Sequence, residues 1–89
     1  MAYVSKNLSV LAYSNGFTLW HYTTPDTATT VDTSGYFNSA ADMVRVGDMI
    51  LANTDTGNSY ATGIFVVASN SNGVVDVANM TQVNSSNTD

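Results

Sequence analysis

The feature that most restricts the fold is a pair of apolar, β-branched runs, Thr62 to Ala68 (TGIFVVA) and Val74 to Met80 (VVDVANM). They flank a short polar segment, Ser69 to Gly73, which ends in Asn-Gly. Asn and Gly readily take the positive φ of a tight turn, and β-branched residues pack well on a pleated surface. This arrangement predicts a β-hairpin.

Shorter segments of the same kind precede this hairpin. Residues 7–13 alternate in part between apolar and polar, and the turn Ser-Asn-Gly at 14–16 separates them from a second strand at 17–22. A further strand is predicted at 49–53, and an edge strand begins at Thr81.

The predicted strand at 17–22 has large side chains on both faces. Because side chains alternate along a strand, one face carries Phe17, Leu19 and His21, and the other Thr18, Trp20 and Tyr22. Such a strand is expected to be covered on both sides, with one cover supplied by another subunit.

The middle of the chain has few strand signals. Residues 23–34 read as a loop, with a turn at Pro25-Asp26. One short helical turn is predicted near Asn38 and Ser39, with Phe37 and Met43 facing the core.

Together these segments predict one all-β domain over residues 1–89, a small barrel or sandwich of about five strands with one short helical turn. Residues 1–6 are expected to form an extended arm. Residues 84–89, which lack apolar side chains, are expected to form a loose tail.

The chain carries few charges: 10% of its residues are charged and its net charge is −5. Ordinary domains are about 25% charged, and charged residues are depleted at the cores of interfaces. An acidic chain without a basic cluster is not expected to bind nucleic acid or an anionic membrane surface. With no cysteine to form a disulfide, a chain of this size is expected to gain stability by assembling.

No catalytic or metal motif emerges, so no enzyme activity, cofactor or metal is predicted. The one histidine, His21, lies within a predicted strand, and the oxygen-rich run Asn53 to Asn58 reads as a turn. Asp48 is expected to bond nearby backbone amides at a turn into the strand. Two alternatives stay open: a carbohydrate-binding module that uses Trp20 or an exposed tyrosine, and a small hydrolase.

Three segments, FTLWHYTT (Phe17–Thr24), GYFNSAADMVRVGDMI (Gly35–Ile50) and GIFVVASNSNGVVDVANM (Gly63–Met80), resemble small virion structural proteins of tailed bacteriophages and prophages. The resemblance implies a non-enzymatic head-decoration or head-fibre component, found in the virion and assembled in the bacterial cytoplasm. It implies contacts with the major capsid protein or other virion proteins, and a homotrimer. A tail or baseplate component is the alternative in the same class.

Residues for these contacts are expected on the N-terminal arm and on the strand 17–22. Arg45, the only arginine, is expected to pair with Asp42 or Asp48, within the chain or across an interface. The predicted interface residues are Tyr3, Val4, Leu8, Val10, Trp20, Tyr22 and Arg45.

Overall fold

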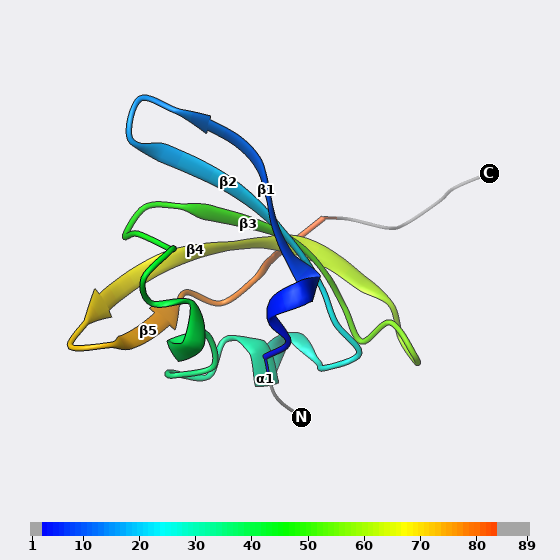
Figure 1. The fold of residues 1–89 in the computed structure, drawn as a ribbon. Coiled ribbons are helices and arrows are strands. Elements are labelled where there is room, and N and C mark those ends of the chain that lie inside the picture. Colours follow the sequence, from blue (N-terminus) through cyan, green and yellow to red (C-terminus); the bar gives the residue numbers. More distant parts are fainter. Residues whose placement is uncertain (1–2, 84–89) are drawn as a thin grey trace.

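The computed structural model, which describes residues 3–83, is built around one open, mixed six-stranded sheet (Figure 1). Five strands lie side by side in the order β1-β2-β3-β4-β5, and β6 pairs with β4. The strands are β1 (Leu8–Ser14), β2 (Phe17–Thr23), β3 (Met49–Thr54), β4 (Ala61–Ser71), β5 (Val74–Val77) and β6 (Thr81–Gln82). The mainly β character is confirmed. The sheet does not close on itself, so the prediction of a barrel is wrong, and the chain forms one sheet rather than the two of a sandwich.

The connection between β2 and β3 explains why one face of the sheet is covered. These two strands are parallel neighbours, whereas the other pairs are antiparallel. Parallel neighbours require a crossover connection, and residues 24–48 provide it. This crossover segment holds α1 (Ala28–Val31) and the 3₁₀ turn η2 (Asn38–Ala40), which lie together below the sheet in Figure 1.

The two helical turns of the crossover segment differ from prediction in part. The turn at Asn38 is confirmed and Phe37 is buried, but Met43 is 47% exposed, because Ala40 and Val44 fill the core positions there. The helix α1 falls in a predicted loop; Thr27 caps its N-terminus, where the Thr27 hydroxyl accepts a hydrogen bond from the Thr30 amide.

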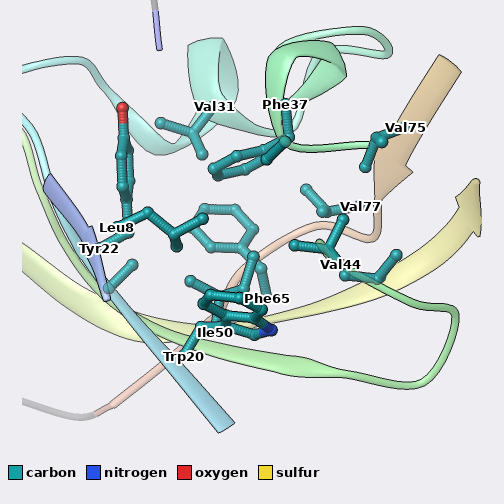
Figure 2. Packing of buried hydrophobic residues seen from close by; sticks show 13 residues of the cluster. Leu8, Trp20, Tyr22, Val31, Phe37, Val44, Ile50, Phe65, Val75 and Val77 are labelled. Carbon is teal, nitrogen blue, oxygen red and sulfur yellow. The ribbon is translucent and has the colours of Figure 1, made fainter. Parts of the chain in front are cut away.

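The hydrophobic core lies between the crossover segment and one face of the sheet (Figure 2). The sheet supplies alternate residues from adjacent strands, and the crossover segment supplies Val31, Phe37 and Val44 from the other side. The sheet residues in this core include Trp20, Tyr22, Ile50, Ala52, Phe65 and Val67. The side of the sheet that faces this core is called the covered face.

Within the expected N-terminal arm, residues 1–6, the backbone of Val4 is extended. Residues 5–7 form a 3₁₀ turn, η1 (Ser5–Asn7). The Tyr3 ring stacks on Tyr22 with 5.7 Å between ring centroids, and the Val4 amide donates to the Tyr22 hydroxyl over 3.1 Å. The described part of the arm therefore packs on its own chain. The expected loose tail, 84–89, lies outside the described residues.

The predicted C-terminal hairpin is confirmed, although its turn is shorter than expected. Strands β4 and β5 are joined by Asn72 and Gly73 alone, both with positive φ. The chain then returns so that β6 lies beside β4, with Gly63 opposite Gln82. A Cβ atom at Gly63 would lie 2.5 Å from the Thr81 carbonyl oxygen, so only glycine permits this close approach.

Candidate docking surface

The face of the sheet opposite the core carries apolar side chains that the described residues leave partly uncovered. Two rows cross the strands: Leu19, Met49 and Val66 are in register, and so are His21, Leu51 and Ile64. Phe17 lies on the same side at the start of β2. These residues, Phe17, Leu19, His21, Met49, Leu51, Ile64 and Val66, are called the open face.

The open face is more apolar than a face exposed to water usually is. Sheets with one solvated face commonly alternate apolar residues inside with polar residues outside. Here Met49 is 42% and Phe17 37% exposed, and the other members of the open face are half-buried. Strands β2, β3 and β4 are thus apolar on both sides at their centres.

The open face also lacks formal charge, since β2, β3 and β4 contain no Asp, Glu, Lys or Arg. The described aspartates lie in the crossover segment, in the β3–β4 connection and on β5: Asp26, Asp32, Asp42, Asp48, Asp55 and Asp76. Removing a charge from water is costly, so an uncharged apolar surface is one that a partner can cover at low cost.

A groove of about 360 Å³ opens on this side of the sheet. It is walled by the open face and by the returning C-terminal segment, and its lining is Met49, Ile64, Val66, Ala78, Asn79 and Thr81. The close approach at Gly63 brings this second wall against β4. The groove is uncharged and mainly apolar, which suits an apolar side chain better than a charged group.

The β1–β2 hairpin is a second exposed apolar region and extends beyond the rest of the sheet (Figure 1). Its turn is Asn15-Gly16, with both residues at positive φ. On β1, which is an edge strand, Val10 is 54%, Leu11 53% and Tyr13 67% exposed. A register shift between Val10 and Ala12 marks a bulge, a common device on edge strands.

The buried carboxylate of Asp48 holds the end of the crossover segment against β2. One carboxylate oxygen accepts from the Thr18 amide over 3.1 Å. The other accepts from the Trp20 indole over 3.1 Å and from the Arg45 amide over 3.0 Å. The prediction that Asp48 bonds nearby amides is confirmed. The group of Arg45 that contacts Asp48 is its backbone amide.

The second buried carboxylate, Asp26, ends a chain of hydroxyl groups. The Tyr36 hydroxyl donates to Asp26 over 2.6 Å and lies 2.9 Å from the Tyr22 hydroxyl. Burial and these hydrogen bonds raise the pKa of Tyr36 well above its ordinary value; burial, with a smaller contribution from Tyr22, also raises the pKa of Tyr3. Such phenols stay protonated at neutral pH, so this network holds the Tyr22 and Tyr36 side chains in place and is poorly suited to proton transfer.

The structure divides the predicted interface residues into two groups. Leu8, Trp20 and Tyr22 lie in the chain's own core and therefore offer little surface to a partner. Tyr3 is half-buried, while Val4, Val10 and Arg45 are exposed, and for these four the contact with another protein stays a prediction.

Sequence reasoning missed the open face as a site. Its signal is present, because both alternating sets of positions on 17–22 and on 62–68 contain large apolar residues. Which set faces water depends on the side over which the crossover segment passes, and strand patterns do not encode that side. The cover expected from another subunit therefore belongs on the face that carries Leu19, because Trp20 is buried in the chain's own core.

Within residues 3–83, no three His, Cys, Asp or Glu side chains gather closely enough to hold a metal ion. The described helices are too short and too polar for any of them to cross a membrane. Comparison with models of protein families, with curated proteins and with solved structures finds no match for this chain.

Proposed function

We propose that this chain is a non-enzymatic structural protein of a bacteriophage virion, which works by docking onto other protein surfaces. The observation that carries the docking function is the open face, an apolar sheet surface without Asp, Glu, Lys or Arg that residues 3–83 leave partly uncovered. The resemblance of its three segments to small virion proteins supports the virion as its setting.

Within the virion, a head-decoration or head-fibre role is the function we propose, with the tail or baseplate as the alternative position. The partners in this proposal are further copies of the chain, as a homotrimer, and the major capsid protein or another virion protein. The exposed β1–β2 hairpin suits a contact with such a larger partner, because residues 7–25 contain no charged side chain that would have to be desolvated.

Labelling the C-terminus and imaging purified particles by electron microscopy tests this proposal. Particles from induced cells that carry the gene are expected to show the label at regular positions on the head. Label on the tail would favour the alternative position. Purified particles without the protein, from cells that express it, would contradict a virion role.

The carbohydrate-binding alternative loses its main candidate residue, because Trp20 is only 6% exposed and its indole is bonded to Asp48. The most exposed tyrosines, Tyr13 and Tyr60, lie at opposite ends of the sheet, one at the tip of the β1–β2 hairpin and the other before β4. They cannot form one stacking platform. A glycan array without signal would remove this alternative.

A further inference from the structure

The groove beside the open face has an acidic side chain next to it. Val75 and Val77 are buried in the core, so Asp76 between them lies on the opposite side of the sheet, the side of the groove. There it stands opposite Ser69, and Ala78, two residues further along, lines the groove. Residues two apart in an extended segment are separated by about 7 Å, so Asp76 stands about one such step from the groove.

The Asp76 carboxylate is half-buried and has no basic neighbour in its own part of the sheet. The chain has two basic residues. Lys6 lies in η1, before the strand at the other edge of the sheet, and Arg45 lies in the crossover segment, which covers the opposite face. A carboxylate that loses more of its water on docking costs free energy unless a cation pairs with it. This position therefore favours a partner that supplies a cation.

We infer that the groove binds an extended segment of another virion protein, in which one apolar side chain enters the groove and a Lys or Arg two positions away pairs with Asp76. The inference rests on the proposed docking function and names the chemistry of the segment that docks. Side chains two positions apart in an extended segment lie on the same side, about 7 Å apart. One such segment can therefore reach the groove and Asp76 together.

Charge argues for this occupant over others. A second copy of the chain brings a net charge of −5 and its own Asp76, so it is repelled at this position. Nucleic acid and anionic lipid are repelled for the same reason. A wholly apolar segment would fill the groove but would leave the neighbouring carboxylate without a partner as it loses water.

The groove is held open by contacts within the chain. The Ala78 amide donates to the Val66 carbonyl over 2.9 Å, and the Val83 amide donates to the Thr62 carbonyl over 2.8 Å. A preformed site loses little conformational entropy on binding. Its volume of about 360 Å³ is at the lower end of ligand-binding pockets, which suits one apolar side chain. A short peptide is therefore expected to bind weakly, with a Kd of about 1 mM.

Titration of the whole isotope-labelled chain with short peptides, followed by amide NMR, tests the inference. The probe is acetyl-Thr-Leu-Thr-Lys-Thr-amide, and its reversed sequence serves the opposite chain direction. One comparison peptide has Glu in place of Lys, and another has Thr in place of Leu. Asp76→Asn removes the carboxylate, whereas Asp42→Asn makes the same change in net charge at an exposed residue of the crossover segment. Thermal unfolding verifies that each variant folds.

The Lys peptide, in at least one direction, is expected to shift the amide signals of the groove residues Val66, Ala78 and Thr81. Replacing either its Lys by Glu or its Leu by Thr should weaken binding about fivefold or more. With Asp76→Asn, the Lys and Glu peptides should bind within about twofold of each other. With Asp42→Asn, the preference for Lys should remain.

Three results overturn the inference. The first is the absence of shifts at the groove with about 10 mM peptide, ten times the expected Kd. The second is a preference for Lys that persists in Asp76→Asn. The third is a shift of the groove signals when the chain is concentrated without peptide, which would identify another copy as the occupant. If Asp76→Asn does not fold, equal binding of the Lys and Glu peptides by the wild type still overturns it.

Particle imaging separates this inference from the proposed function. A chain that is found on virions but whose groove ignores the Lys peptide contradicts only the docking of an apolar and basic segment. A chain that binds the peptide through Asp76 but is absent from purified particles contradicts only the virion role.

Discussion

The covered face and the open face belong to the same three central strands, yet they differ in how their apolar side chains are used. On the covered face, Ile50 and Phe65 are fully buried beneath the crossover segment. On the open face, their sequence neighbours Met49 and Ile64 are similar in chemistry but remain partly exposed. The path of residues 24–48 therefore decides which face of these strands is buried. The residue types do not decide it, because both faces carry side chains that could form a core.

The largest contrast is expected from truncating adjacent residues on the two faces. Phe65→Ala should lower the free energy of unfolding by about 3–5 kcal/mol, because it leaves a cavity in the core. Ile64→Ala, on the open face, should cost roughly 1–2 kcal/mol in the monomer, since a half-buried side chain loses less. Urea unfolding at low micromolar concentration measures both, and equal losses would mean that the two faces are equally packed.

Removing the Asp48 carboxylate should weaken the attachment of the crossover segment to β2. Asp48→Ala leaves the Trp20 indole and two backbone amides without their acceptor. A loss of about 3 kcal/mol is expected, because buried donors without partners cost about 1–3 kcal/mol each and part of this is recovered by water. Asp42→Ala, at an exposed position of the same segment, is the control and should change stability by less than about 0.5 kcal/mol. Similar effects of both variants would argue against this role of Asp48.

A methyl group at Gly63 should damage the groove on the open face. Gly63→Ala places Cβ against the Thr81 carbonyl and the Met80 side chain, so β6 must move. A loss of roughly 1–3 kcal/mol is expected. Hydrogen exchange should also speed up at the Val83 amide, which donates to the Thr62 carbonyl. Gly57→Ala, where a Cβ meets no atom within 4 Å, is the control.

The smallest effect on stability is expected from raising the pH into the range where tyrosines ordinarily ionise, and it concerns Tyr36 of the crossover segment. The pKa of Tyr36 is raised in the folded chain. The stability that comes from keeping this phenol protonated is therefore fully present below about pH 10, the ordinary value for tyrosine, and is lost as pH rises above it. Tyr36→Phe should be less stable at neutral pH, because Asp26 loses a donor, but its stability should fall less between pH 9 and pH 11. An unchanged slope in melting temperature over that range would contradict this assignment.

Much of the fold follows from local patterns in the sequence. The alternation at 7–13 and 17–22, the run at 49–53 and the hairpin around Asn72-Gly73 all correspond to observed strands. Local patterns did not predict the parallel pairing of β2 with β3, because it joins segments far apart in the chain. Nor did they predict α1, whose threonines and valine have modest helix propensity and which depends on its Thr27 cap.

The candidate site was less predictable than the strands. That a central strand would be apolar on both faces followed from the large residues at Leu19 and Trp20. The interface was then expected at Trp20 and Tyr22, which the crossover segment covers instead. Aromatic residues are typical of interfaces and of cores alike, so their type could not decide between the two environments.

The parallel pairing of β2 and β3 also bears on the order in which the chain folds. The three antiparallel pairs β1–β2, β3–β4 and β4–β5 join strands that are close in sequence and can form early. The parallel pairing of β2 with β3 requires closing the loop formed by residues 24–48, and closing so long a loop costs chain entropy. We therefore expect the centre of the sheet to be completed last, so that the strands most apolar on both sides stay accessible until the end of folding.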